Sequence, residues 1–554
     1  MVPEHTEGSV VVVGAGPVGK TAALLLASYG IGTVVIEKGD GLSDEPKAIS
    51  VDDETLRIYQ QAGIVEDVLR IIVPGIGTQY FDSEGEPLFL GGSPRPGRFG
   101  YPFKNPFSQP ELEQVLHAAL TREPLVTYLT GHEVRELHQS PREVTVRVAA
   151  SDGSEFDVSA AFLIGADGGR STVRAQAGIP MTGRSYPDAW LVVDTTNDPH
   201  DERYGLHYGD PRRPHVIVPG LDGRCRYEFP VTPGECEAGA EPPLELIQQL
   251  LKPYRSISAD EIDRAVVYRF HALNSTQYRV GRVFVAGDAA HMMPPFAGQG
   301  LNSGMRDVFN LSWKIAHVLA GTMADSALDS YDSERRPQAG LVVAFSERLG
   351  RVVMTENSRL AHARDRIVRS HLADPDGLRY FQAMGFRPPL TLRQGLLVAG
   401  EGPVGDALPQ PRVFDLTAGA LVPLDVPLGG DWAIVGVQVD AAGWADAAQV
   451  AAVTGAQRVH VDLDGRNPRS LPVDRIIADV DGTLADALRA RSGRFLLVRP
   501  DRVLAASWAP GEQEQIIAAV TPWFTSASSD GADQAAEAVA TARGAGTARA
   551  EGTS

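Results

Sequence analysis

Three glycines with the spacing Gly14-x-Gly16-x-x-Gly19 follow the apolar run Val10–Val13. Helix-forming sequence continues to Ser28, and a second β-branched run ends at the acidic residue Glu37. Glycines at these positions permit a tight turn, close approach of the backbone to a pyrophosphate and close packing of helix on strand, while the acid accepts hydrogen bonds from a ribose. The pattern predicts a dinucleotide-binding βαβ unit, and by itself it does not distinguish FAD from NAD.

A second acidic residue, Asp288, follows the apolar run 283–286 and precedes the glycine-rich stretch PPFAGQGLN at 294–302. An acid at the end of a strand can accept from a ribityl or ribose hydroxyl, and glycine-rich backbone can approach a flat ring. The helix predicted from about Gly300 to Ala320 would direct its positive end at that ring and stabilise the negative charge of a reduced flavin. These features favour a flavin cofactor.

A third pair, Asp167-Gly168, ends another buried run and by itself is typical of an Asx turn. In this order, the three motifs resemble those of the single-component FAD-dependent aromatic hydroxylases, the class A flavoprotein monooxygenases. The resemblance covers about residues 8–345 and is most specific in PPFAGQGLNSGMRDVFNLSWK. Within the family, PFKNPFSQPELEQVL is most similar to the 3-(3-hydroxyphenyl)propanoate hydroxylases, and the polyketide hydroxylases are close relatives.

The resemblance implies an α/β fold with three domains. A Rossmann-like FAD-binding domain of the GR2/PHBH type would comprise residues 1–73, 101–178 and 275–388, and a β-sheet substrate domain residues 74–100 and 179–274. The Pro- and Gly-rich segment 387–413 indicates a domain junction. After it, 389–524 resemble a thioredoxin-like C-terminal domain without CxxC, and 525–554 have the composition of a disordered tail.

The cofactor contacts that the resemblance implies lie at the motifs. Glu37 would bind the adenosine ribose, Asp288 the ribityl chain or a ribose, and Pro295 would lie beside flavin C4a. Lys47 stands where the family usually has arginine, so it keeps the charge without the bidentate fork. The expected cofactor-binding residues are Gly14, Gly16, Pro17, Gly19, Glu37, Lys38, Lys47, Gln109, Asp167, Asp288, Pro295, Gly298, Gly300, Leu301 and Asn302.

Catalytic residues are less marked in the sequence. Besides Pro295, the candidates are His215 and Tyr227, which lie on the predicted substrate sheet and could face the pocket, although a packing role is the simpler interpretation for both. Strand alternation places Tyr227 on one face with Cys225 and Phe229. Three further groups have structural interpretations: Asp52 and Asp53 as helix N-terminal acids, His291 as the residue that holds its turn, and Arg212 and Arg213 as exposed loop arginines.

The reaction that the resemblance implies uses NADH or NADPH to reduce FAD, after which O₂ forms a flavin C4a-hydroperoxide that hydroxylates a phenolic ring. The expected substrate is a small aromatic compound of the 3-hydroxyphenylpropanoate type, in aromatic catabolism. A polyketide or other natural-product hydroxylase and a Baeyer–Villiger oxygenase remain alternatives on the same scaffold. A flavin-binding protein without catalysis is a remote alternative.

The composition of the chain limits the kinds of partner that the protein is expected to bind. The chain has 554 residues and a net charge of −19, which argues against binding to nucleic acid or to an anionic membrane surface. Two cysteines and an N-terminus without a signal-peptide pattern are typical of a cytoplasmic protein. The histidines lack metal-ligand spacing, so no metal site is expected, and a homodimer is compatible with these features.

Overall fold

A six-stranded sheet brings the three motifs to one edge in this computed structural model, which describes residues 9–42, 48–92, 95–200, 204–400, 402–465 and 471–525. Its order is β17-β18-β11-β1-β2-β7, and all neighbours except β17 and β18 are parallel. β1, β2, β11 and β18 are buried throughout, which explains their β-branched runs. The strands are β1 (Val10–Val13), β2 (Thr33–Ile36), β7 (Val126–Leu129), β11 (Phe162–Gly165), β17 (Arg279–Val280) and β18 (Val283–Val285).

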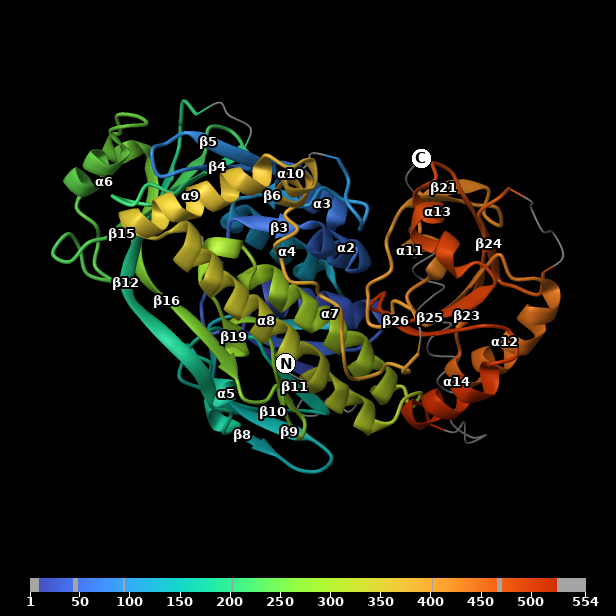
Figure 1. The fold of residues 1–554 in the computed structure, drawn as a ribbon. Helices are drawn as coiled ribbons and strands as arrows, with labels where there is room; N and C mark the ends of the chain where they lie inside the picture. The colour runs from blue at the N-terminus through green and yellow to red at the C-terminus, as the bar shows by residue number, and fades with distance from the viewer. Residues whose placement is uncertain are drawn as a thin grey trace.

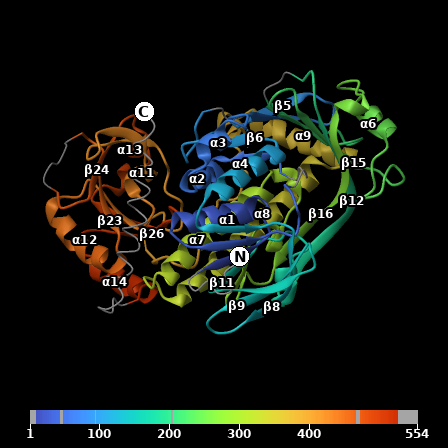
Figure 2. The ribbon, with the colours of Figure 1, turned by 180° about the vertical axis from the view of Figure 1, so that it is seen from behind.

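Helices from distant parts of the chain cover this sheet (Figures 1 and 2). The first, α1, directly follows the glycine motif and packs against α7 and α4. α4 begins at Gln109, yet its preceding Ser108 makes no side-chain capping bond. The helices of this part are α1 (Pro17–Ser28), α2 (Asp53–Gln61), α3 (Val65–Leu69), α4 (Gln109–Arg122), α5 (Thr172–Gln176), α7 (Gly300–Leu319), α8 (Ser330–Val353), α9 (Ser358–Leu372) and α10 (Pro375–Gln382).

Two small antiparallel sheets flank these layers. The first has the order β10-β9-β8, and the second pairs β3 with β6 beside the start of α2. Their strands are β8 (His132–Gln139), β9 (Val144–Ala150), β10 (Glu155–Ala160), β3 (Ser50–Asp52) and β6 (Lys104–Pro106).

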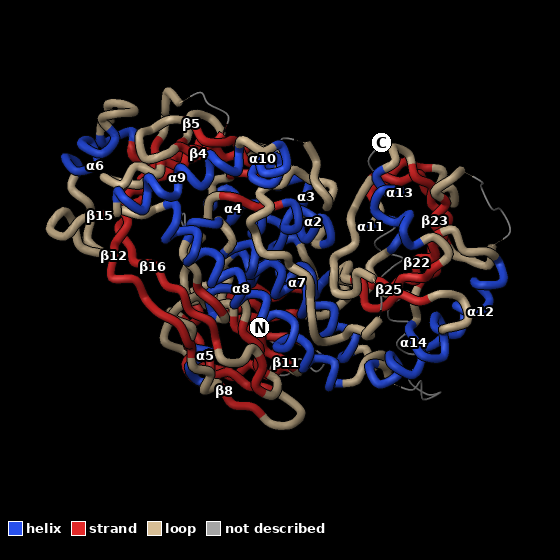
Figure 3. The backbone as a smooth tube through the Cα atoms, viewed as in Figure 1, coloured by secondary structure: helices blue, strands red, loops and turns tan. Residues whose placement is uncertain are grey.

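An eight-stranded sheet lies across the parallel one, with the order β19-β16-β12-β15-β14-β13-β4-β5 (Figure 3). It joins strands from both segments that the sequence assigned to the substrate domain. The long strands β12 and β16 run along one side of the molecule, and α6 (Leu244–Leu251) packs against the sheet. The strands are β4 (Gly77–Phe81), β5 (Pro87–Gly91), β12 (Met181–Thr195), β13 (Tyr204–Tyr208), β14 (His215–Pro219), β15 (Cys225–Val231), β16 (Ile262–Ser275) and β19 (His291–Met292).

The C-terminal unit forms a separate lobe beside α7 (Figures 1 and 2). Its seven-stranded sheet has the order β21-β20-β24-β23-β22-β25-β26, and only β22, β23 and β24 run parallel to one another. Its elements are β20 (Arg412–Asp415), β21 (Ala420–Pro423), α11 (Asp425–Leu428), β22 (Ala433–Val437), α12 (Ala441–Thr454), β23 (Gln457–Asp462), β24 (Arg475–Asp479), α13 (Thr483–Leu488), β25 (Arg494–Val498), β26 (Leu504–Trp508) and α14 (Gln513–Val520).

Two sequence predictions concern residues that the structure does not describe. Lys47 and residues 526–554 of the expected tail lie outside the described residues. Within the described ranges, no helix has both the length and the apolar character needed to cross a bilayer.

Candidate active site

A cavity of about 1680 Å³ runs from the carboxyl edge of the parallel sheet to the face of the eight-stranded sheet. This volume exceeds the roughly 300–1,000 Å³ of a pocket for a single small ligand. The motif residues after β1, β2, β11 and β18 line one end, and strands β4, β14 and β16 line the other. The cavity therefore has room for a dinucleotide and a second molecule.

The three glycines of the first motif have different roles. A Cβ on Gly14 would lie 2.5 Å from the Ala166 oxygen, and one on Gly19 would lie 2.0 Å from the Gly14 oxygen, so the packing of strand and helix excludes side chains there. A Cβ on Gly16 would meet no protein atom within 4 Å. Gly16 caps α1 and lines the cavity, where its bare backbone is accessible to a ligand.

Glu37 ends β2 with its carboxylate held towards the glycine turn. Oε2 accepts a hydrogen bond from the Ala15 amide at 2.8 Å, and Oε1 accepts one from the Gly39 amide at 2.9 Å. Each oxygen keeps a further lone pair, and the residue lines the cavity beside exposed Lys38. This arrangement suits a pair of ribose hydroxyls.

Asp167 follows β11 and holds the start of α5. One carboxylate oxygen accepts from the Ser171 hydroxyl, and the other accepts from the Val173 amide at 3.1 Å. Burial raises the pKa of Asp167, and these hydrogen bonds oppose the increase. Because these hydrogen bonds come from residues four and six positions later, they hold the start of α5 instead of closing an Asx turn, and Asp167 also lines the cavity.

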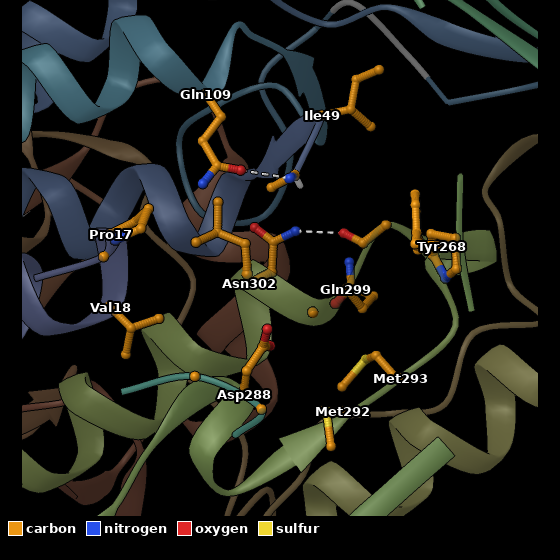
Figure 4. Close-up of a pocket in the computed structure, with 18 of the residues that line it drawn as sticks. Pro17, Val18, Ile49, Gln109, Tyr268, Asp288, Met292, Met293, Gln299 and Asn302 are labelled. Atoms are coloured by element: carbon orange, nitrogen blue, oxygen red, sulfur yellow. Dashed lines mark hydrogen bonds between the residues drawn. The ribbon is translucent and has the colours of Figure 1, made fainter. Parts of the chain in front are cut away.

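Asp288 lies exposed to the cavity between the buried residues Gly287 and Ala289 (Figure 4). The turn that presents it is fixed from below by Asp307, whose Oδ2 accepts from the Gly287 amide at 3.0 Å and lies 2.7 Å from His291 Nε2. Burial raises the pKa of Asp307, but His291 and Arg335 lower it below its ordinary value. The structural role inferred for His291 is confirmed.

The start of α7 faces the same end of the cavity (Figure 4). Asn302 Nδ2 donates to the Gly298 oxygen at 2.7 Å, and its Oδ1 accepts from the Asp52 amide at 3.0 Å. Gln109 Oε1 accepts from the Ala48 amide at 2.7 Å, which fixes the facing loop. The first amides of a helix have no acceptor within it, so the α7 terminus presents donors and partial positive charge to the cavity.

The far end of the cavity combines aromatic walls with polar groups that the sequence did not reveal. Aromatic and apolar residues contributed by the sheet and the segments above it are Tyr80, Phe103, Val216, Val218, Tyr268, Phe270, Phe296, Leu349 and Phe386. The polar residues that line this end include Thr78, Lys104, Ser185, His207, Glu228, Arg264, Arg269, His271 and Arg387. Burial lowers the pKa of His207 to about 3, so its ring is neutral at physiological pH. The only usable signal for these polar residues was strand alternation. It placed Tyr227 on one face of the strand, so that its neighbour Glu228 lies on the other face.

His215 and Tyr227 lie on the opposite face of this sheet, in the core beneath α6. The His215 ring contacts the Tyr254 hydroxyl, and its Nδ1 donates to the Arg213 oxygen at 2.8 Å, while the Tyr227 hydroxyl donates to Asp198 at 3.1 Å. Neither residue lines the cavity. The physical reason is the period of two along β14 and β15, which directs their neighbours Val216 and Glu228 to the cavity instead.

The remaining predicted residues either line the cavity or have a structural role. All expected cofactor-binding residues within the described ranges line the cavity except Gly19, which serves the packing of α1. Asp52 caps α2 by accepting from the Thr55 amide at 2.9 Å, and Asp53 is the first residue of that helix. Arg212 and Arg213 pair with Asp210 and Glu235 at 2.8 and 2.7 Å.

Comparison with known proteins identifies the class. A family model described as an FAD binding domain matches residues 7–346, and one described as the HcaD C-terminal domain matches residues 405–522. The chain is 35% identical to 3-(3-hydroxy-phenyl)propionate/3-hydroxycinnamic acid hydroxylase 2 of Burkholderia vietnamiensis, over 90% of this chain and 93% of that protein. It is 36% identical to the corresponding hydroxylase of Mycobacterium sp. strain JLS, over 91% and 90%.

Solved structures share the fold. The flavin-dependent monooxygenase PieE in complex with FAD and substrate matches with a TM-score of 0.76 at 22% identity, over 94% of this chain and all (100%) of that one. Aklavinone-11 hydroxylase with FAD and aklavinone matches with a TM-score of 0.71 at 22% identity, over 98% and 99%. The chain belongs to the FAD-binding monooxygenase family. Within that family it is a flavin-dependent aromatic hydroxylase.

The residues at the sheet edge fit FAD. Space beside Gly16 admits a pyrophosphate, the acids Glu37 and Asp288 face the cavity for hydroxyl groups, and the start of α7 offers amides to a ring.

Proposed function

We propose that the protein uses NADH or NADPH and O₂, with FAD, to hydroxylate a small phenolic acid of the 3-(3-hydroxyphenyl)propanoate type. The observation that carries the proposal is one cavity that joins the FAD-binding edge to an aromatic chamber. The relatives named for this substrate class are 35–36% identical over nine tenths of the chain, whereas the polyketide enzymes are similar in fold at 22%.

FAD, when bound, supplies the exchange of electrons between the nicotinamide and O₂. The chain's own residues bind and orient: Glu37 and Asp288 would hold hydroxyls of the cofactor, and the α7 terminus would stabilise negative charge at the ring edge. Pro295, in the turn before α7, would lie beside the reacting face and adds no amide donor there. The aromatic walls exclude water from the substrate and present its ring to that face.

We also propose a thioredoxin-like fold for the C-terminal unit. Its core order β23-β22-β25-β26, with α12 joining the parallel pair and α14 after the last strand, supports this proposal. The two cysteines, Cys225 and Cys236, both lie in the substrate sheet segment rather than in this unit. The unit therefore contains no cysteine for dithiol exchange.

Hydroxylation of a polycyclic polyketide is the second candidate, favoured by the size of the cavity. The two candidates are separated by measuring NAD(P)H oxidation by the FAD-loaded protein with simple phenolic acids and with anthracycline- or tetracycline-type substrates. Mass spectrometry with labelled O₂ would identify the product. We expect a catechol-type acid carrying one labelled oxygen. Labelled product from the polycyclic compounds alone would contradict the proposed substrate class.

A further inference from the structure

The substrate end of the cavity contains a guanidinium group with no carboxylate partner. Arg387 lines the cavity and lies over the Phe103 ring, 4.1 Å from its centroid. Among the described residues, its guanidinium makes no ion pair and no side-chain hydrogen bond, although burial lowers its pKa. Arg387 is partly exposed to the cavity, whereas each described arginine that is buried pairs with an aspartate or glutamate, as Arg335 does with Asp307 at 2.9 Å.

A second cation faces the same chamber from β6. Lys104 Nζ donates to the Thr78 hydroxyl at 2.6 Å, which leaves two of its hydrogens for another acceptor. Burial, followed by the charge of Arg387, lowers the pKa of Lys104 to about 8. Both cations line the same cavity, and Lys104 is still largely protonated at neutral pH.

Three carboxylates act on this pair, Asp52 and Asp53 on Arg387 and Glu228 on Lys104, and none forms an ion pair with either cation among the described residues. Asp52 forms an ion pair with Arg306, and Glu228 lies 4.0 Å from Arg226. A desolvated positive charge is stable when an anion completes the site, so the chamber is electrostatically complementary to a negatively charged ligand.

We propose that Arg387, assisted by Lys104, binds the carboxylate of the substrate, selects phenolic acids over uncharged aromatic compounds and fixes which end of the substrate faces the flavin. The proposal rests on the proposed function and adds the residues that recognise the acid. A guanidinium can bind a carboxylate through two parallel hydrogen bonds. Asp52, whose amide donates to Asn302 in the first turn of α7, lines the same cavity as Arg387, so the cation and the helix terminus face one chamber.

The expected selectivity for the acid over an uncharged analogue follows from the cost of keeping the two cations in the chamber without an anion. An uncharged analogue of the same size would fill the aromatic chamber but leave two cations without an anion. Hydrogen bonds to charged groups typically contribute enough that losing one lowers affinity about 10- to 100-fold. The acid should therefore bind at least that much more tightly than its amide, and this preference should depend on Arg387.

The test is an equilibrium titration of the FAD-loaded protein with 3-(3-hydroxyphenyl)propanoate and with its primary amide, read by calorimetry and by the flavin absorbance change. In Arg387→Met we expect the Kd of the acid to rise about 10- to 100-fold while the Kd of the amide changes little. Arg387→Lys should fall between, and Lys104→Met should show a smaller loss. Arg366→Met removes an exposed arginine of α9 and serves as the matched control.

The outcomes separate the two proposals. Equal binding of acid and amide by the unmodified protein, or equal losses for both ligands in Arg387→Met, would overturn the carboxylate site and leave the hydroxylase proposal intact. Retained flavin content in each variant shows that the fold is preserved. Failure of the unmodified protein to bind or hydroxylate any phenolic acid would instead overturn the proposed function.

Discussion

At the scale of single residues, the three glycines of the first motif have different roles. Gly14 and Gly19 are required because a Cβ on either would lie within 2.5 Å of backbone oxygen. Gly16 is free of such contacts and faces the cavity. Within these six residues, some glycines therefore determine the stability of the fold and another determines the affinity for the cofactor.

Substituting these glycines should show that separation. Gly19→Ala should destabilise the fold by several kcal/mol, because overpacking against rigid backbone costs about 1–3 kcal/mol or more. Gly16→Ala should fold normally and bind FAD at least about tenfold more weakly, because the added methyl occupies the space of the pyrophosphate. Thermal denaturation of the flavin-free proteins and a fluorescence titration with FAD measure the two effects. A Gly16→Ala protein with unchanged FAD affinity would show that the pyrophosphate lies elsewhere.

At the scale of elements, the first turn of α2 concentrates three acids beside one arginine. Arg306 pairs with Asp52 and with Glu54, whereas Asp53 has no such partner among the described residues. Burial, followed by the charges of Asp52 and Glu54, raises the pKa of Asp53 to about 7. The helix end thus contains an acid whose ionisation opposes folding.

The sign of the pH dependence follows from this increase. An acid whose pKa is higher in the folded than in the unfolded protein binds protons more tightly when folded, so its ionisation reduces stability as pH rises from about 4 to about 7. Asp53→Asn should therefore gain stability relative to the unmodified protein across this window, by at most about 1.4 kcal/mol per pH unit. Denaturant unfolding at several pH values measures it.

A matched control is Asp376→Asn, which changes an acid that is 81% exposed. Its stability difference from the unmodified protein should stay nearly constant with pH. If the Asp53→Asn difference is equally flat, Asp53 titrates in the folded protein as it does in the unfolded chain.

At the scale of the whole molecule, a buried ionic cluster joins the C-terminal unit to the FAD-binding part. Glu334 of α8 binds Lys314 of α7 at 2.7 Å and Arg499, which follows β25, at 2.8 Å. Burial raises the pKa of Glu334, but Arg499 and Lys314 lower it well below its ordinary value. Trp313 packs edge-on against Trp432 beside this cluster, with ring centroids 5.5 Å apart.

Removing one partner should uncouple the C-terminal unit. Arg499→Met leaves Asp501 without its buried cation and weakens the hold on Glu334, and breaking such a pair costs about 3–5 kcal/mol. We expect faster hydrogen exchange in β22 and β25 at unchanged FAD affinity. Arg458→Met, which removes a half-exposed ion pair of the same unit, should cost no more than about 1 kcal/mol. Equal hydrogen-exchange rates in both variants would show that apolar packing alone attaches the C-terminal unit to the FAD-binding part.

Much of this fold could be predicted, but not the face of the substrate sheet that meets the ligand. The run Val10–Val13 and the helix from about Gly300 lie where the sequence predicted them. His215 and Tyr227 were placed on the correct strands, yet those strands turn these side chains away from the cavity. Arg387 stood at the edge of a Pro- and Gly-rich junction, where nothing local marks a ligand contact.

The sequence by itself determined the local chemistry: the glycine turn, the acids that end strands and the helix that begins beside them. These features depend on steric limits and hydrogen bonds among neighbours in the chain, so a short stretch contains the whole cause. Only the tertiary structure decided that turns after Val13, Gly165 and Val285 meet at one edge, and that Lys104 and Arg387 face one chamber. Such meetings depend on parallel pairing and on which side of a sheet is covered, and both are properties of packing between distant segments.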